Sequence, residues 1–201
     1  MTKKELAITL SRLDIFSSVE IKSEQYPTDS EIAADILWFA SLNDDIEGKI
    51  IADLGAGTGI LGIGCLLMGA KKVFFVEKDK EAIKVLEKNL KYVDKNNFEI
   101  INSDITYFNK KVDVVVQNPP FGTKKKHADI RFLEKATTLS NIVYSFHKSE
   151  TKNFIDKKIE DLNFKMTHYF EFDFPIKHSM KHHRKKIERI RVGCWRTSKA
   201  D

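Results

Sequence analysis

The feature that most constrains this chain is a short apolar run leading directly into three closely spaced glycines. Residues 49–54 read KIIADL, residues 55–59 read GAGTG, and residues 60–68 read ILGIGCLLM. A short apolar run bounded by glycines is typical of a buried strand, and the run after the loop is long enough for a helix. A strand, a glycine loop and a helix begin a parallel α/β unit, whose ligands bind beyond the carboxyl ends of the strands.

The rest of the chain continues this alternation of strands and helices. Further strands are expected at 72–77, 98–102, 112–117 and 141–146, and further helices at 78–93, 129–139 and 148–162. Two final strands, 165–172 and 187–195, have a short connection with little helical pattern, so we predict an antiparallel hairpin. The sequence therefore predicts one α/β domain over 1–201, with a seven-stranded, mostly parallel sheet covered by helices on both faces.

Two helices are expected before the glycine loop. Leu6, Leu10 and Leu13 recur at helical spacing in the first of them. Thr28 followed by Glu31 has the spacing of a capping box, which predicts a second helix that ends near Leu42. Segment 1–48 is thus expected to be an N-terminal helical addition to the sheet.

Charge is unevenly distributed along the chain. Lys and Arg number 34 and Asp and Glu 29, which gives a net charge of +5. Residues 176–201 hold nine of the bases and only two of the acids, so the rest of the chain is slightly acidic. Clustered bases favour contact with nucleic acid or another polyanion, and a solvated tail is the alternative. We expect residues 176–186 to form a basic insertion within the final hairpin.

Other features exclude several classes of protein. A hydrophobic content of 42% argues against wholesale disorder, and the apolar runs are too short to span a membrane. The N-terminus is too polar for a signal peptide. Cys65 and Cys194 form no Cys-x-x-Cys pair, so a disulfide framework is not expected and a reducing cytoplasm fits. His178, His182 and His183 lie among lysines, and we predict no metal site.

Polar residues stand at the carboxyl ends of four predicted strands, namely Asp53, Glu77, Asp104 and Asn118. A carboxylate at the end of the second strand suits both hydroxyl groups of a ribose. Residues 57–62 also match G-x-G-x-x-G, a weak signal for a dinucleotide. However, an acid just before the glycines repels a pyrophosphate and favours a cation. These features favour S-adenosylmethionine, which has a ribose and a sulfonium. A plain turn at the loop and a turn-capping Asp104 are the alternatives.

Asn118-Pro119-Pro120-Phe121 follows the fourth predicted strand, where catalysis is expected. An exocyclic amino group is a poor nucleophile, and acceptors for its two N–H groups help to expose its lone pair. The Asn118 side-chain oxygen and the Pro119 carbonyl are such acceptors, and neither proline adds a competing N–H. Phe121 offers a flat face for a flipped base. A rigid turn after a strand is the alternative interpretation.

These residues together resemble a known family. Asp-Leu-Gly-Ala-Gly-Thr-Gly at 53–59 with Asn-Pro-Pro-Phe at 118–121 resembles S-adenosylmethionine-dependent amino-methyltransferases, which have a Rossmann-like class I fold. The segments EQYPT at 24–28, IAA at 32–34, NPPFGTK at 118–124, FL at 132–133 and YSFHK at 144–148 narrow the resemblance to the methyltransferase-like protein 5 family. It covers nearly the whole chain.

The resemblance implies methylation of adenine N6 in small-subunit ribosomal RNA, a cofactor-covering role for segment 1–48, and a small zinc-binding activator protein as partner. Animal members have Cys-Gly-Cys where residues 56–58 read AGT, and Asp where Glu77 stands. The catalytic residues are expected to be Asn118, Pro119, Pro120 and Phe121. The expected cofactor contacts are Gln25, Tyr26, Thr28, Asp53, Gly55, Gly57, Thr58, Gly59, Ile60, Glu77, Lys78, Asp104, Ile105 and Asn118.

Two lysine-rich segments are expected to flank the pocket and bind RNA phosphates. The expected contacts are Lys124, Lys125, Lys126, Lys181, Arg184, Lys185 and Lys186. Methylation of a protein glutamine is the main alternative, although those enzymes usually have Tyr after Asn-Pro-Pro. A DNA adenine methyltransferase usually needs a separate recognition domain, a dehydrogenase needs a hydride-transfer acid, and a non-catalytic RNA-binding module leaves Asn-Pro-Pro-Phe unexplained.

Overall fold

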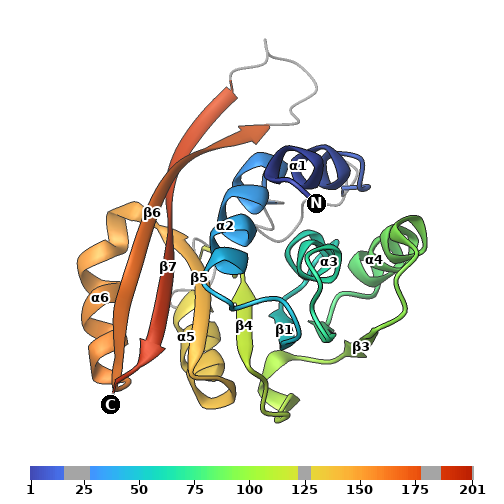
Figure 1. The fold of residues 1–201 in the computed structure, drawn as a ribbon. Helices are drawn as coiled ribbons and strands as arrows, with labels where there is room; N and C mark the ends of the chain where they lie inside the picture. The colour runs from blue at the N-terminus through green and yellow to red at the C-terminus, as the bar shows by residue number, and fades with distance from the viewer. Residues whose placement is uncertain (16–27, 122–127, 178–186, 201) are drawn as a thin grey trace.

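Five parallel strands and a C-terminal antiparallel pair form one seven-stranded sheet in the computed structural model (Figure 1), which describes residues 1–15, 28–121, 128–177 and 187–200. The strand order is β3-β2-β1-β4-β5-β7-β6. The strands are β1 (Ile50–Leu54), β2 (Lys72–Glu77), β3 (Phe98–Asn102), β4 (Val114–Gln117), β5 (Ile142–Lys148), β6 (Phe164–Lys177) and β7 (Ile187–Lys199). This topology is the class I methyltransferase fold, and the predicted fold class is confirmed.

Helices cover both faces of the sheet, as predicted. The face that carries Ile51 and Val116 packs against α1 (Lys3–Ser11), α2 (Ser30–Leu42), α3 (Ile60–Leu67) and α4 (Lys80–Val93). The other face packs against η1 (Ile105–Tyr107), α5 (Ala128–Leu139) and α6 (Lys152–Asp161), the last preceded by the short η2 (Ser149–Thr151). Strands β1, β2 and β4 are therefore buried on both sides, which explains why their sequences are continuous apolar runs.

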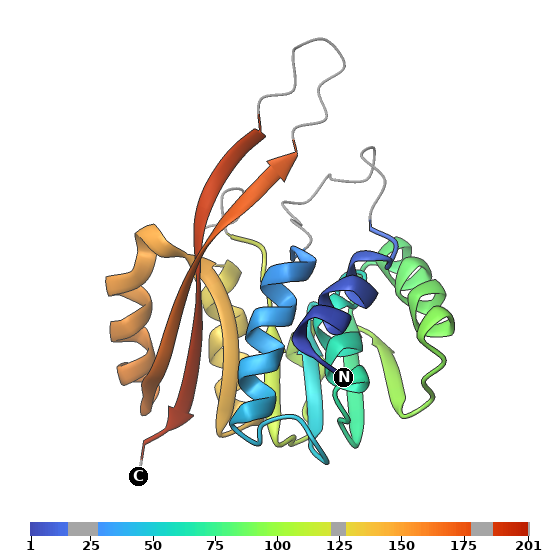
Figure 2. The same ribbon diagram turned by 45° about the horizontal axis from the view of Figure 1, so that its top comes forward.

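The hairpin of β6 and β7 differs from the other strands in length and position. β7 lies between β5 and β6 and runs antiparallel to both. β6 has 14 residues and β7 has 13, and both extend past the carboxyl end of β5, as Figure 2 shows. β6 continues through Lys177, so the expected basic insertion at 176–186 begins inside a strand. The remainder of that insertion lies outside the described residues.

The N-cap predicted for the second helix, α2, is wrong. Asp29, not Thr28, is the N-cap of α2, and its side-chain oxygen accepts hydrogen bonds from the backbone N–H groups of Glu31 and Ile32. The Thr28 hydroxyl is engaged elsewhere, since it accepts a hydrogen bond from Asn118. A capping box does occur at the start of α1, between Thr2 and Glu5. Local spacing alone did not distinguish these two threonines.

Three further predictions concern disulfides, membrane-spanning helices and metal sites. Both cysteines are buried free thiols, and burial raises their pKa values well above the ordinary value. Among the helices of the described ranges, we find none that combines the length and apolar character needed to cross a membrane. The described residues also contain no cluster of His, Cys, Asp or Glu suited to a metal ion; the three histidines at 178, 182 and 183 lie outside these residues.

Candidate active site

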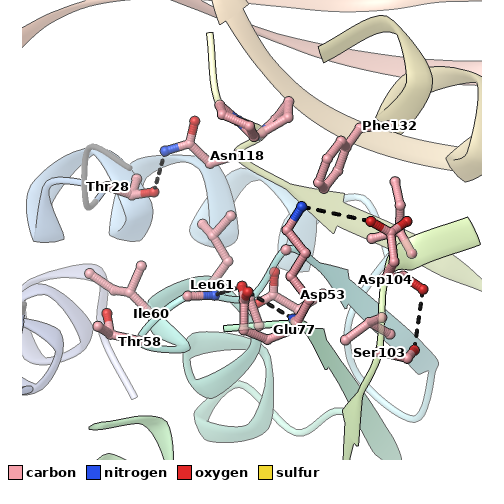
Figure 3. Close-up of a pocket in the computed structure, with 18 of the residues that line it drawn as sticks. Thr28, Asp53, Thr58, Ile60, Leu61, Glu77, Ser103, Asp104, Asn118 and Phe132 are labelled. Carbon is pink, nitrogen blue, oxygen red and sulfur yellow. Dashed lines mark hydrogen bonds and ion pairs between the residues drawn. The ribbon is translucent and has the colours of Figure 1, made fainter. Parts of the chain in front are cut away.

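A pocket lies at the carboxyl edge of the parallel strands, between the glycine loop and the Asn-Pro-Pro-Phe loop (Figure 3). About 880 Å³ of empty space lies within it, including space open to solvent. Its lining residues are Thr28, Asp53, Gly55, Ala56, Gly57, Thr58, Ile60, Leu61, Val76, Glu77, Lys78, Ser103, Asp104, Ile105, Asn118, Pro119, Pro120, Phe121 and Phe132. Chain segments from 28 to 132 thus meet in one cavity.

The glycine loop owes its shape to left-handed backbone and close packing. Gly55 has a φ of +68°, and a Cβ there would lie 2.8 Å from Phe132 Cε1. Its backbone N–H and that of Ala56 both donate to the Val76 carbonyl, which docks the loop on the end of β2. Residues with side chains are strained in this conformation and have no room there. The loop therefore exposes backbone to the pocket without side-chain obstruction.

Glu77 organises the loop from the end of β2. The side chain is 4% exposed, and its Oε2 accepts a hydrogen bond from the Gly57 N–H at 2.9 Å. Its Oε1 accepts from the N–H groups of Lys78 and Asp79 at 2.8 and 2.9 Å. A carboxylate has about four acceptor positions, so about one remains for a ligand. The contact of Glu77 with the hydroxyl groups of a ribose stays a prediction.

Asp53 is the most strongly perturbed acid in the pocket. It is 2% exposed, and its Oδ2 accepts a hydrogen bond from the Gly62 N–H at 2.8 Å. Burial raises the pKa of Asp53 to about 7; the Gly62 hydrogen bond opposes this rise and the nearby Glu77 charge adds to it. A buried carboxylate of this kind favours a ligand with positive charge, because a cation stabilises its ionised form.

Asp104, just after β3, caps η1 and also lines the pocket. Its Oδ1 accepts hydrogen bonds from the backbone N–H and the hydroxyl of Thr106, so it caps η1 as the alternative interpretation stated. These bonds hold its pKa below the ordinary value. Its Oδ2 lies 3.7 Å from Lys78 Nζ, beside Phe132 at the same end of the pocket (Figure 3). The residue therefore shapes the pocket wall and also lines it.

Asn118 meets the N-terminal segment across the pocket. Its side-chain Nδ2 donates to the Thr28 hydroxyl at 2.9 Å, as Figure 3 shows. Phe121 is 8% exposed, which means that most of its ring is covered by the protein. The hydrogen bond directs the amide nitrogen toward Thr28, so the oxygen occupies the opposite side of the amide.

Comparison with known proteins identifies the family. The profile of a family described as Conserved hypothetical protein 95 matches residues 21–169. The rRNA N(6)-adenosine-methyltransferase METTL5 of Danio rerio is 35% identical over 203 residues, which cover 98% of each chain. The corresponding protein of Drosophila melanogaster is 36% identical over 96% of this chain and 94% of its own length.

The chain belongs to the methyltransferase-like protein 5 family.

Among solved structures, PH1948 of Pyrococcus horikoshii, described as a candidate RNA methyltransferase, is 48% identical to this chain. It matches with a TM-score of 0.91 over the full length of both chains. The sequence-based resemblance to the methyltransferase-like protein 5 family is therefore confirmed, as is the fold that it implied.

The pocket contains most of the residues expected from the sequence of this methyltransferase. All four expected catalytic residues line it. Eleven of the expected cofactor residues line it as well, namely Thr28, Asp53, Gly55, Gly57, Thr58, Ile60, Glu77, Lys78, Asp104, Ile105 and Asn118. Gly59 does not line it; with a φ of +90° it is the N-cap of α3 and packs against Leu86. Their roles toward a ligand stay predictions.

Some expected residues lie outside the described part of the chain, and some lining residues were not expected. Gln25 and Tyr26 are in the first group, together with Lys124, Lys125, Lys126, Lys181, Arg184, Lys185 and Lys186. The second group is Ala56, Leu61, Val76, Ser103 and Phe132. Phe132 is in the first half of α5. Helical side chains lean toward the N-terminus of their helix. The place of Phe132 early in a helix that follows the Asn-Pro-Pro-Phe loop is therefore a sequence signal that it lies over the pocket.

Proposed function

We propose that this chain transfers the methyl group of S-adenosylmethionine to N6 of an adenosine in small-subunit ribosomal RNA. One observation carries the proposal: the acid-lined glycine loop and the Asn-Pro-Pro-Phe loop line the same pocket. The relatives from Danio rerio and Drosophila melanogaster, which bear the name rRNA N(6)-adenosine-methyltransferase, support the choice of RNA as substrate.

The pocket fits S-adenosylmethionine on its own chemistry. Gly55 brings backbone to the pocket wall, and the carboxylates of Asp53 and Glu77 supply negative charge, while Lys78 pairs with Asp104. Residues Asp104, Ile105 and Phe132 form a partly apolar end suited to a flat base. When bound, this cofactor supplies an electrophilic methyl group on a sulfonium.

Asn118 and Pro119 prepare the acceptor amine in this proposal. The Asn118 Oδ1 and the Pro119 carbonyl accept the two N–H groups of the adenine amino group, which frees its lone pair from the ring. Thr28 holds the Asn118 amide in the orientation that this requires. Phe121 stacks on the flipped base. The chain thus acts by orientation and polarisation rather than by a strong general base.

Basic residues in two segments outside the described part of the chain are proposed to flank the pocket and bind the RNA backbone. Lys124, Lys125 and Lys126 follow Phe121 closely in the sequence, and Lys181, Arg184, Lys185 and Lys186 join β6 to β7. Phosphate contacts make binding salt-dependent, so charge reversal at Lys124–Lys126 should weaken RNA binding and reduce its salt slope. Unchanged binding and slope in a filter-binding titration would contradict this role.

A small zinc-binding activator protein is the proposed protein partner, on the basis of the family resemblance. Co-expression with such a protein should raise the thermal midpoint and the yield of this chain, since a partner that binds only the native state stabilises it. An unchanged midpoint in the mixture would indicate that this chain works without it.

The test of the proposed function is transfer of tritiated methyl groups to ribosomal subunits, naked ribosomal RNA and a protein fraction. The label should appear in RNA at adenine N6, and Asn118→Ala should reduce the rate at least about a hundredfold. Asn97→Ala, the same change at the amino edge of the sheet, is the control. Label found only in the protein fraction would favour glutamine methylation instead.

A further inference from the structure

Four polar side chains form a buried chain of hydrogen bonds between β4, β5 and α5. Gln117 Nε2 donates to Ser145 Oγ at 2.9 Å, and Ser145 Oγ lies 2.7 Å from His147 Nε2. His147 Nδ1 lies 3.1 Å from Asp129 Oδ2. Gln117, Ser145 and His147 are 0% exposed. These three side chains are therefore shielded from water, whereas the Asp129 side chain is 14% exposed.

The hydrogen bonds of this network fit one assignment of donors and acceptors. Ser145 Oγ accepts from Gln117, so its own proton has an acceptor only at His147 Nε2. The remaining ring proton is then on Nδ1 and is donated to Asp129. Burial raises the pKa of Asp129, but the hydrogen bond from His147 lowers it, and the net pKa lies below the ordinary value. A neutral His147 protonated on Nδ1 therefore satisfies every donor in the chain.

Ser145, His147 and Asp129 have the connectivity of a hydrolytic triad, but their burial excludes that role. A nucleophilic serine needs access to the substrate carbonyl and a free hydroxyl proton path to the base. Ser145 is 0% exposed and accepts a hydrogen bond from the fully buried Gln117. The group instead has the features of a structural network that fixes its neighbours.

The two ends of this network bracket the Asn-Pro-Pro-Phe loop. Gln117 immediately precedes Asn118 and pairs with Ser145 in the β4–β5 register. Asp129 is in the first turn of α5, which is the first helix after the loop. His147 lies between them, 5.5 Å from the Trp195 ring in an edge-on contact that restricts its rotation. Buried hydrogen-bond networks restrain the residues at their ends, and in this one the Gln117 Oε1 alone has no hydrogen-bond partner among the described residues.

We propose that His147 is a positioning residue, which joins both flanks of the Asn-Pro-Pro-Phe loop through Ser145–Gln117 and Asp129 and thereby fixes Asn118 for methyl transfer. This inference rests on the proposed function. In this proposal His147, near the end of β5, contributes to methyl transfer without contact with the substrate. The cofactor pocket does not include Gln117, Ser145, His147 or Asp129, so the network acts on turnover rather than on cofactor binding.

Ser145→Ala removes the middle of the network with a minimal change of volume. We expect kcat for RNA methylation to fall at least about tenfold, while the Kd for S-adenosylhomocysteine in calorimetry stays within about twofold. Ser140→Ala is the matched control, because Ser140 is a buried serine at the opposite end of β5, bonded to the backbone of Asp113 and Ile142. Ser140→Ala should keep kcat even where it lowers the thermal midpoint.

A pair of Asp129 variants separates positioning from folding. Asp129→Ala should lower kcat like Ser145→Ala, and Asp129→Asn, which keeps an acceptor for the Nδ1 proton, should recover most of the lost rate. Wild-type kcat in Ser145→Ala, or losses that follow the thermal midpoint in all variants including Ser140→Ala, would overturn the positioning role.

The tautomer of His147 gives a test that does not depend on activity. In ¹⁵N-labelled protein, nitrogen NMR should show that the neutral His147 ring carries its proton on Nδ1, and Ser145→Ala should change the Nε2 shift. Protonation on Nε2 would overturn the network. If the wild-type protein methylates no RNA, the proposed function fails, and the tautomer still decides whether the network exists as described.

Discussion

The side-chain amide of Asn118 donates a hydrogen bond to the hydroxyl of Thr28 at 2.9 Å, across 90 positions of sequence. Thr28 is 5% exposed and stands two residues before α2, whereas Asn118 directly follows β4. An amide that is held by its nitrogen presents its oxygen in a fixed direction. The bond therefore couples the N-terminal segment to the residue proposed to bind the target amine.

Replacement of Thr28 by Val keeps the side-chain shape and removes the acceptor for this bond. We expect kcat for methyl transfer to fall about tenfold, because the Asn118 amide loses the hydrogen bond that orients its nitrogen toward residue 28. Thr28→Ser keeps the hydroxyl and should retain most of the rate. Steady-state kinetics at saturating cofactor distinguishes the two variants, and equal rates for Val and wild type would contradict the coupling.

Asp53 should make stability depend on pH in a specific direction. Its pKa is raised from 3.8 to about 7 in the folded chain, so between these values the native state holds a proton that the unfolded state releases. The native state then loses stability as pH rises from about 4 to 7, by up to about 4 kcal/mol. Asp53→Asn lacks this loss.

The measurement is urea unfolding of wild type and Asp53→Asn without cofactor, from pH 4 to pH 8. The free energy of unfolding of Asp53→Asn minus that of wild type should increase with pH and level off above about 7. Asp94→Asn, the same change at an exposed residue with positive φ that Asn tolerates, is the control. A constant difference between Asp53→Asn and wild type across the range would show that Asp53 does not titrate there.

Glu77→Gln should weaken cofactor binding by distorting the glycine loop. Glutamine has one acceptor oxygen and cannot satisfy the three backbone N–H groups that the carboxylate receives. We expect the Kd for S-adenosylhomocysteine to rise at least about tenfold in calorimetry. Glu99→Gln on the neighbouring strand, where the side chain pairs with Lys72 and Lys110, should leave the Kd unchanged. Wild-type affinity in Glu77→Gln would rule out this role.

Asn89 should affect cofactor binding without lining the pocket. It is 2% exposed in α4, and its Nδ2 donates to the carbonyls of Thr58 and Asp14, each at 3.0 Å. Its Oδ1 accepts from the Asp14 N–H at 2.8 Å. The side chain thus ties the chain after α1 to the glycine loop. Asn89→Ala should raise the Kd for S-adenosylhomocysteine several-fold, because Thr58 lines the pocket.

Asn97→Ala is the control for this prediction. Asn97 also bonds two backbone carbonyls, those of Ala70 and Lys71, but at the amino edge of the sheet away from the pocket. A similar loss of affinity in both variants would indicate a general effect on stability. Loss in Asn89→Ala alone would show that the tie to Thr58 matters.

Local sequence patterns determined the elements and the location of the pocket. The limits of β2 and β3 match the prediction, because each is an apolar run with a clear turn on both sides. The ligand edge also followed from the sequence, since parallel strands place their carboxyl ends together and Asp53, Glu77, Asp104 and Asn118 each lie at or just after such an end. Residue type and chain direction were sufficient for these conclusions.

Only the tertiary structure decided which of these polar groups bond to one another. The sequence predicted a helix cap for Thr28, but the fold brings its hydroxyl to Asn118 and leaves the cap to Asp29. Likewise, the buried position of His147 between Ser145 and Asp129 depends on the packing of α5 against β5. A hydrogen bond requires a partner at the right distance and angle, and long-range packing, which local periodicity does not encode, supplies that partner.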